Sequence, residues 1–435
     1  MAGQALTVEP VRDDEEPGHW YAQVQPWYCD GNDVALLRGG EQLFPAMCEA
    51  IQQARYDVWL ATYIFNDDPA ADAVLQALEA AARRGVRVRV VVDGFGAKAG
   101  LESLKRRLTA AEADLAVFRP MEGWRSWFQP EHLRRLHQKL CAVDGELGFV
   151  GGINLIDDRV DLTHGALDAP RLDFAVRVRG PVVGPIEQTV RAMWTRAIVG
   201  RDWTEQIVAM ARSPRPAMRV RRLLSQARLP TRASGLLAPP QAPPTPMRAA
   251  FVVRDNLRQR RTIERSYIEA IRNARERIDL VSPYFYPGQA FRRVLRQAAS
   301  RGVRVRLLMQ GRWDYQVAAM AARAVYGDLR THGVRIFEYT PAFLHAKVAL
   351  VDGDWATVGS SNIDPLSLLL NLEANVIVRD PGFVATLERE LDAAFEVATE
   401  IGSEQPRSAW ARLRRHAVAV GARLYMRLAG VRKRY

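Results

Sequence analysis

His137-Gln-Lys139-Leu-Cys-Ala-Val-Asp144, followed after six residues by Gly151-Gly-Ile-Asn154, decides the fold because it occurs twice. The second copy reads His345-Ala-Lys347-Val-Ala-Leu-Val-Asp352 and is followed after six residues by Gly359-Ser-Ser-Asn362. Both copies keep His, Lys, Asp, Gly and Asn in the same order and at the same spacing. Packing alone rarely repeats so many polar residues in register. The pattern therefore predicts two halves of one active site.

The repeat extends on both sides of the motif, and each segment of the first half has an echo in the second. The pairs are 54–65 with 274–285, 75–93 with 294–309, and 172–181 with 372–381. Gly85 and Gly302 follow the last helical residues of the second pair, where glycine is a helix C-cap signal. Helices and β-branched strands alternate in both halves. This predicts two duplicated α/β domains with mixed or mostly parallel sheets, related by a pseudo-two-fold axis.

A proline-rich stretch separates the two halves. Its prolines, between Ser213 and Pro246, cannot continue a helix or a central strand. We therefore expect five parts, which are an N-terminal extension (1–30), a first α/β domain (31–209), a Pro-rich linker (210–248), a second α/β domain (249–400) and a basic tail (401–435). We expect a monomer to be catalytically complete, with the active site between the two domains.

The composition is that of a soluble globular protein with a basic excess. The 435 residues are 48% hydrophobic and 25% charged, and the formal net charge is +12. Such a charge favours an anionic partner, either nucleic acid or an anionic membrane surface, although an arginine-rich composition alone would produce it too. The three cysteines form no CxxC pair, which favours a reducing compartment and argues against a zinc site.

No segment of the sequence is typical of export or of membrane insertion. Residues 1–18 have no apolar stretch of the kind found in signal peptides. No run of about 18 apolar residues occurs, so we expect no transmembrane helix. If the protein works on membranes, we expect it to lie on their surface.

Each motif places a histidine and a lysine two residues apart on a predicted strand, so both side chains share one face. The alternate residues, such as Leu136, Leu140, Leu344 and Val348, then face the core. A single His or Lys on a strand is most often structural. Two matched sets in register predict two imidazoles and two ammonium groups that converge on one point.

Such a site suits a phosphate diester. Lys139, Lys347, Asn154 and Asn362 would bind the non-bridging oxygens, while one histidine attacks phosphorus. The other histidine would protonate the leaving oxygen and then deprotonate the incoming acceptor. Because the protein supplies the cations, we expect neither a metal nor another cofactor.

The paired motifs resemble the HxKxxxxD signatures of the phospholipase D superfamily, and the likeness covers about Asp30 to Glu396. Finer details resemble the bacterial cardiolipin synthase branch, in a shorter form without the two N-terminal membrane helices of long members. The segments that carry this second likeness are 31–37, 63–67, Asp93-Gly-Phe-Gly96, Pro283-Tyr-Phe285 and 359–365.

The resemblance implies a phosphatidyl-histidine intermediate, with His137 as the nucleophile and His345 as the acid and base. It also implies a carboxylate that orients each imidazole. Glu373 follows His345 by 28 residues, and Asp173 occupies the equivalent place in the first repeat, after an insertion at about 157–171. We count the motif acids Asp144 and Asp352 with the catalytic set, and expect them to buttress the site rather than touch phosphorus.

Two segments have the composition of membrane contacts. Trp124-Arg-Ser-Trp127-Phe128 mixes aromatic and basic residues, as interfacial loops do. After Glu404 the chain has nine Lys and Arg and no acid, intermixed with apolar residues as in an in-plane amphipathic helix. Either segment would also suit an ordinary core-facing helix or a solvated tail. The resemblance implies a peripheral protein on the cytoplasmic face of the cell membrane, with phosphatidylglycerol as substrate.

Three functions remain open on the sequence. The first is a cardiolipin synthase, which transfers a phosphatidyl group between phosphatidylglycerol molecules. The second is a phospholipase D-type hydrolase, which uses the same residues with water as acceptor. The third is a nucleic-acid phosphodiesterase, which the positive charge would also suit. Two internal motifs with both aspartates intact favour a lipid enzyme over a nuclease, so we expect no nucleic-acid partner.

Overall fold

The computed structural model describes residues 21, 25–120, 134–211, 247–255, 258–312 and 326–402. The Trp124–Phe128 segment, most of the predicted linker and the basic tail lie outside these ranges, so the expectations for them stay predictions. Helix α5 ends at Ala211 and strand β10 begins at Met247, on either side of the proline-rich stretch.

The first half alternates strands and helices as the sequence predicts. Its elements are β1 (Cys29–Arg38), α2 (Gly39–Gln53), β2 (Asp57–Thr62), α3 (Pro69–Arg83), β3 (Arg87–Asp93), α4 (Leu101–Ala110), β4 (Asp114–Phe118), β5 (Leu140–Val143), β6 (Leu147–Gly151), β7 (Val160–Asp161), β8 (Gly165–Ala166), β9 (Phe174–Arg179) and α5 (Val183–Ala211). The short β7–β8 hairpin occupies the insertion that precedes Asp173.

The second half repeats this order without the hairpin. Its elements are β10 (Met247–Arg254), α7 (Thr262–Asn273), β11 (Arg277–Val281), α8 (Gln289–Ser300), β12 (Arg304–Gln310), β13 (Arg335–Tyr339), β14 (Val348–Val351), β15 (Trp355–Gly359), α10 (Pro365–Leu369), β16 (Glu373–Arg379), α11 (Pro381–Glu396) and β17 (Thr399–Glu400).

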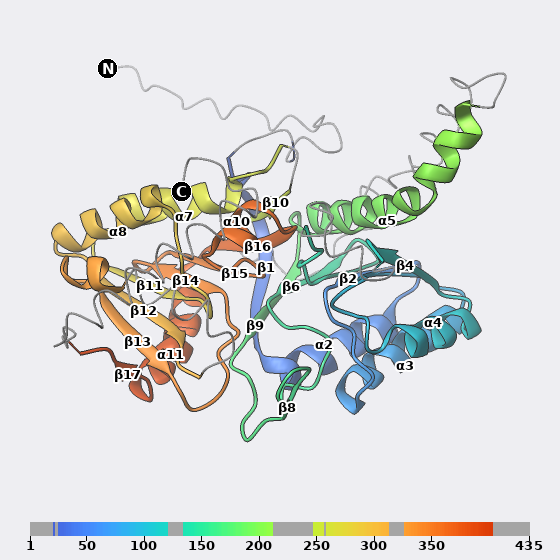
Figure 1. The fold of residues 1–435 in the computed structure, drawn as a ribbon, viewed down its shortest axis with the longest axis horizontal. Helices are drawn as coiled ribbons and strands as arrows, with labels where there is room; N and C mark the ends of the chain where they lie inside the picture. Colours follow the sequence, from blue (N-terminus) through green and yellow to red (C-terminus); the bar gives the residue numbers. More distant parts are fainter. Residues whose placement is uncertain are drawn as a thin grey trace, which may run out of the picture.

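One sheet runs through both halves, and its strand order is symmetric about the centre. The order is β17-β13-β12-β11-β14-β15-β16-β10-β1-β9-β6-β5-β2-β3-β4. At the centre β1 pairs antiparallel with β10, while β2-β3-β4 and β11-β12-β13 are parallel. The predicted fold class is thus confirmed, as two duplicated α/β units with mixed strands in a pseudo-two-fold arrangement (Figure 1).

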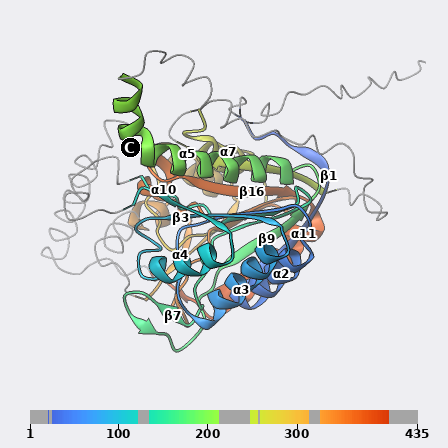
Figure 2. The same ribbon diagram turned by 90° about the vertical axis from the view of Figure 1, so that its right-hand side faces the viewer.

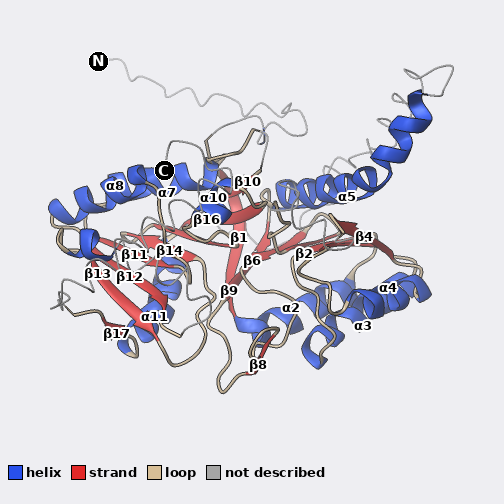
Figure 3. Ribbon diagram, viewed as in Figure 1, coloured by secondary structure: helices blue, strands red, loops and turns tan. Residues whose placement is uncertain are grey.

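Helices cover the strands on both sides (Figures 1 and 3). Viewed from the side, α5 and α7 lie above the strands, while α2, α3, α4 and α11 lie below them (Figure 2). One hydrophobic core contains residues of α5, α11 and the strands of both halves, so it joins them. Two further cores lie under α2 and α3 and under α7 and α8. Their burial fixes the halves against each other through apolar area removed from water.

The local sequence explains the helix ends that frame the sheet. Asp68 caps α3 by accepting hydrogen bonds from the Ala70 and Ala71 amides, and Pro69 occupies the first turn, where its missing N–H costs nothing. Gly85 and Gly302 have φ of +89° and +91°, the left-handed conformation that favours glycine after a helix. Both predicted C-caps are therefore confirmed.

The sheet register brings each motif to the carboxyl edge of the parallel strands. Leu140, the first residue of β5, lies opposite Ala61 near the end of β2. Val348 lies opposite Val281, the last residue of β11, in the second half. Ligand sites of α/β sheets usually lie at this edge. The prediction that His and Lys lie within the strands is wrong by a few residues, because β5 and β14 begin immediately after Lys139 and Lys347.

None of the helices that the structure describes is long and apolar enough to cross a bilayer.

Candidate active site between the two halves

The imidazole of His137 is held by an acid from the other half of the molecule. Its Nδ1 lies 3.0 Å from Oε2 of Glu373, the first residue of β16. The Glu373 side chain is fully buried. Burial alone would raise the pKa of Glu373, but His137, Lys139 and the Ser360 hydroxyl outweigh it and lower that pKa. An ionised carboxylate on Nδ1 leaves Nε2 as the free, reactive nitrogen of His137.

The second imidazole has the mirror arrangement. Nδ1 of His345 lies 2.6 Å from Oδ2 of Asp173, which directly precedes β9 of the first half. Burial raises the pKa of Asp173 to about 6, although Lys347 opposes the shift. Burial also lowers the pKa of both imidazoles, and Lys347 and Lys139 lower it further. Both histidines therefore favour the neutral form that a nucleophile or a general base needs.

Each half thus supplies the carboxylate that holds the imidazole of the other half, an arrangement that we call the exchange of acids. Backbone pairing between the halves produces it. Leu136 forms an isolated bridge with Leu372, and Leu172 forms one with Leu344. The His137 amide donates to the Leu372 carbonyl at 3.0 Å, and the His345 amide donates to the Leu172 carbonyl at 2.9 Å. The first motif thus pairs with Leu372, which precedes Glu373, and the second motif pairs with Leu172, which precedes Asp173. Spacing within one repeat could not reveal this, because the pairing joins segments far apart in sequence.

The two lysines are buried beside the imidazoles. Lys139 is 6% exposed and Lys347 is 1% exposed. Each ammonium donates to the carbonyl oxygen of the histidine two residues before it, at 2.7 Å for Lys139. Burial lowers the pKa of Lys139 to about 7 and that of Lys347 to about 8, against the pull of Glu373 and Asp173. An anionic phosphate bound beside them would give these ammonium groups a negatively charged hydrogen-bond partner in addition to the carbonyl oxygens.

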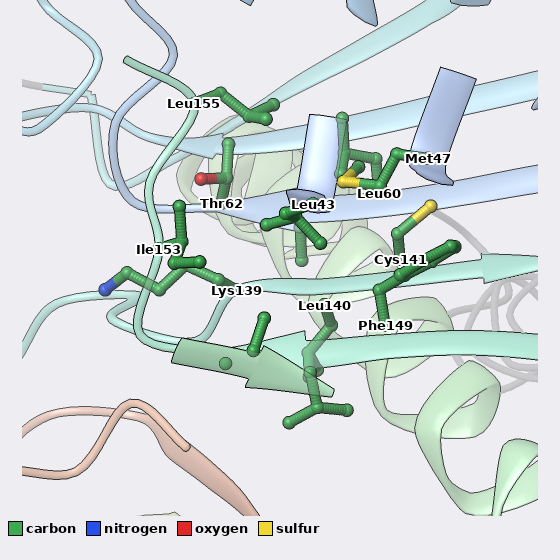
Figure 4. Close-up of a pocket in the computed structure, with 14 residues that line it drawn as sticks. Leu43, Met47, Leu60, Thr62, Lys139, Leu140, Cys141, Phe149, Ile153 and Leu155 are labelled. Carbon is green, nitrogen blue, oxygen red and sulfur yellow. The ribbon is translucent and has the colours of Figure 1, made fainter. Parts of the chain in front are cut away.

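Apolar packing directs the Lys139 side chain. A cavity of about 20 Å³ borders its stem, lined by α2, β2, β5 and β6. Figure 4 shows the ammonium pointing away from the apolar side chains of Leu60, Cys141 and Phe149. Leu136, Leu140, Leu344 and Val348 lie in the core shared by the halves, as the alternation predicts. The core thus fixes the strands that begin immediately after the two lysines.

The two predicted phosphate-binding asparagines are mostly buried, each 8% exposed. Oδ1 of Asn154 accepts the Ile64 amide at 3.3 Å. Within the described residues, Oδ1 of Asn362 is buried and has no hydrogen-bond partner. Each asparagine follows the end of the strand paired with its motif strand, β6 or β15.

The motif aspartates lie at the opposite ends of β5 and β14 from the imidazoles. Asp144 accepts the backbone amides of residues 55, 56 and 57 at 2.8–2.9 Å, and Asp352 accepts those of residues 275, 276 and 277. Both have positive φ, at 54° and 51°. The four residues of β5 separate Asp144 from Lys139, so the two positions are five residue steps apart along the strand, roughly 16 Å. The two acids therefore tie the strand turn to the preceding helix end, where they have no direct reach to phosphorus.

Sequence reasoning missed Ser360 as part of the site. This fully buried residue donates its hydroxyl to Oε2 of Glu373 at 2.6 Å and accepts the Ala374 amide. The first repeat has Gly152 at the equivalent position, where an added Cβ would collide with the Asp173 carboxylate. The alignment of Gly-Gly with Gly-Ser in the two motifs was the only signal for this difference.

Comparisons with known proteins agree with this geometry. The family model described as "Cardiolipin synthase, PLD-like domain" matches residues 47–167 and 267–395, which include both motifs. Cardiolipin synthase B of Escherichia coli is 35% identical over 395 residues, covering 90% of this chain and 87% of that protein. Cardiolipin synthase A of Pseudomonas putida is 32% identical over 373 residues, covering 86% and 70%.

Among solved structures, the crystal structure of phosphatidylserine synthase from Haemophilus influenzae matches with a TM-score of 0.58. The match covers 92% of this chain and 94% of that one, at 12% sequence identity. A likeness at this identity concerns the fold.

Proposed function

Because the chain belongs to the cardiolipin synthase family of PLD-like domain proteins, we propose that it joins two phosphatidylglycerol molecules into cardiolipin and releases glycerol. It is a phosphatidyltransferase. The observation that carries the mechanism is the exchange of acids, in which Glu373 holds His137 and Asp173 holds His345. Two oriented imidazoles with two buried ammonium groups suit substitution at a phosphate diester.

In the first step His137 acts as the nucleophile. Its Nε2 attacks phosphorus of the donor lipid while the bond from phosphorus to the glycerol oxygen breaks. His345 enters this step protonated, a form that the anionic phosphate favours, and it gives its Nε2 proton to that oxygen, so neutral glycerol leaves and a phosphatidyl-histidine remains. The carboxylate of Glu373 stabilises the positive charge that develops on the His137 ring.

In the second step the free hydroxyl of another phosphatidylglycerol attacks phosphorus. His345, now neutral, takes the hydroxyl proton, the bond from phosphorus to His137 breaks, and cardiolipin forms. Asp173 holds the His345 ring in the orientation that both proton transfers need. The charge on the phosphoryl oxygens is met by Lys139 and Lys347, with Asn154 and Asn362 beside them. We assign Asp144 and Asp352 to the support of the strands that carry these groups.

We propose that the protein works as a peripheral protein on the cytoplasmic face of the membrane. The net charge of +12 supports attraction to an anionic leaflet, where each basic residue near the surface contributes about 1 kcal/mol. The Trp124–Phe128 segment and the tail after Glu404 are the parts that we assign to lipid contact.

The decisive experiment incubates the purified protein with phosphatidylglycerol vesicles, without added metal, and separates the products by mass. Cardiolipin with an equal amount of glycerol is the expected result. Phosphatidic acid alone would instead identify a hydrolase that uses water as acceptor. If no lipid product forms, nucleic-acid phosphodiesters become the next substrates to test.

A second measurement tests the assignment of the nucleophile. The His345→Ala variant should slowly accumulate a phosphatidyl group on His137, because it lacks the acid that speeds the first step and the base that the second step needs. The His137→Ala variant should show no covalent adduct. Mass spectrometry of tryptic peptides at neutral to alkaline pH detects the adduct. An adduct on His345 in the His137→Ala variant would reverse the two roles.

A further inference from the structure

A buried carboxylate holds the backbone immediately before His137. Asp93, the last residue of β3, is fully buried, and its Oδ2 accepts the Leu136 amide at 2.9 Å. Its Oδ1 accepts the amides of Phe95 and Gly96 at 2.9 and 3.2 Å. The Arg135 guanidinium lies 3.7 Å from the same oxygen. Burial raises the pKa of Asp93, and Arg135 and these three amides oppose that shift.

The second half has the same contact with a neutral side chain. Gln310, the last residue of β12, accepts the Leu344 amide on its Oε1 at 3.1 Å. Leu344 precedes His345 as Leu136 precedes His137. In both halves, therefore, the side chain at the end of the middle parallel strand accepts the peptide N–H one residue before the histidine.

The two acceptors differ in chemistry but hold the same peptide group. Asp93 is a carboxyl group beside the Arg135 guanidinium, and Gln310 is a neutral amide. The feature that the halves share is therefore the hydrogen bond to the residue before each histidine.

We propose that Asp93 and Gln310 are a matched pair of positioning residues for the two imidazoles. Each accepts a peptide N–H and so fixes the direction in which the next residue presents its imidazole. An imidazole displaced by even 1 Å loses much of the benefit of its orientation. This inference rests on the proposed function only in that the site acts on a phosphate diester.

The test compares kcat and KM for the full-length protein and its variants. Asp93→Ala removes the acceptor of the Leu136 amide and should lower kcat by about tenfold at the pH optimum, with KM nearly unchanged. Asp93→Asn keeps a side-chain oxygen that can accept the same amide and should lose much less.

The same hydrogen bond is tested in the second half. Gln310→Ala removes the acceptor of the Leu344 amide and should lower kcat at the pH optimum by about tenfold. Gln310→Glu keeps an acceptor and should lose much less. Asp114→Asn, which removes an exposed carboxylate at the edge of the same sheet, is the matched control and should leave kcat unchanged.

The inference fails if folded Asp93→Ala is as active as Asp93→Asn, or if Gln310→Ala is as active as Gln310→Glu. If the Asp93 variants do not fold, as circular dichroism would show, the two Gln310 variants decide the matter alone. Each rate is measured on phosphatidylglycerol and on bis(4-nitrophenyl) phosphate. Absence of cardiolipin with normal diester cleavage would refute the proposed function while leaving this test valid.

Discussion

At the residue scale, the site depends on carboxylates that hold imidazoles across the junction of the halves. Sequence reasoning identified both acids and both histidines, because the duplicated motif carries them at matching places. It could not tell which acid holds which ring, since that depends on the Leu136–Leu372 and Leu172–Leu344 pairing. It expected Asp144 and Asp352 to buttress the site rather than touch phosphorus, and their contacts with backbone amides agree with that expectation.

Amide substitutions of the two acids should inactivate the enzyme without unfolding it. In Glu373→Gln the ring of His137 loses the carboxylate that fixes its tautomer, and Asp173→Asn does the same to His345. We expect kcat to fall by about 10³–10⁴ in each, as for other carboxylate-oriented histidines. Steady-state cardiolipin formation measures the loss. A fall of less than tenfold in either variant would contradict the assigned roles.

Burying the Lys139 ammonium should lower the stability of the fold, although the catalytic site needs that charge. Burial lowers the pKa of Lys139 to about 7, below its value in the unfolded chain, so protonated Lys139 disfavours folding below pH 7. Lys139→Met should therefore raise the free energy of unfolding at pH 6, by up to about 4 kcal/mol. The gain should shrink between pH 7 and 10.5, as the unfolded-state lysine loses its proton.

Urea unfolding of both proteins at pH 6 and pH 10 checks the stability change, and the same variant should lose at least 99% of transferase activity. The exposed Lys98→Met provides the control, for which both free energies should stay within about 0.5 kcal/mol of the wild type. A destabilised Lys139→Met at pH 6 would mean that packing of the lysine stem outweighs its charge.

At the scale of elements, the close approach of strands leaves room for glycine only. Gly152 follows β6 directly, and an added Cβ there would collide with the Asp173 carboxylate. Gly152→Ala should push that carboxylate away from His345 and lower kcat by about 10²-fold or more. Gly184→Ala in α5, where nothing lies within 4 Å of the new Cβ, should leave kcat unchanged.

Equal activity of the two alanine variants would show that the backbone at Gly152 shifts freely. An observed fall in kcat with an unchanged KM would instead place the effect on proton transfer rather than on lipid binding. Thermal unfolding of both variants separates this from a general loss of stability.

The helices and strands were largely predictable, because the sequence pattern of most of them occurs once in each repeat. Segments 75–93 and 294–309 end their helices at a glycine of positive φ, and this signal is local. The point at which β5 and β14 begin was not predictable, because Lys139 and Lys347 continue the extended chain and their carbonyls still accept the Gly151 and Gly359 amides.

At the scale of the whole molecule, the two halves form one unit. The shared core includes α5, α11 and strands of both halves, and each half supplies the acid for the other half's imidazole. The duplication predicted this arrangement in outline. Because β1 pairs with β10, the sheet passes through the junction without an edge.

The catalytic set should therefore act within one chain. An equal mixture of His137→Ala and His345→Ala should be as inactive as either variant alone, because neither chain has both imidazoles in one cleft. Cardiolipin formation by the two separate proteins and by their mixture, refolded together from urea, provides the measurement. Recovery of about a quarter or more of wild-type activity would mean that chains exchange halves to build mixed sites.

The antiparallel pairing of β1 with β10 also bears on how the two halves could have evolved. Two copies of a single-motif chain that met through this strand would build the same cleft, but strict symmetry would force every pair of equivalent positions to be identical. Joining the copies in one polypeptide removes that constraint. Each position can then mutate on its own, as Asp173 and Glu373, Gly152 and Ser360, or Asp93 and Gln310 now differ. Covalent fusion thereby allows an originally reciprocal site to divide its labour between donor and acceptor.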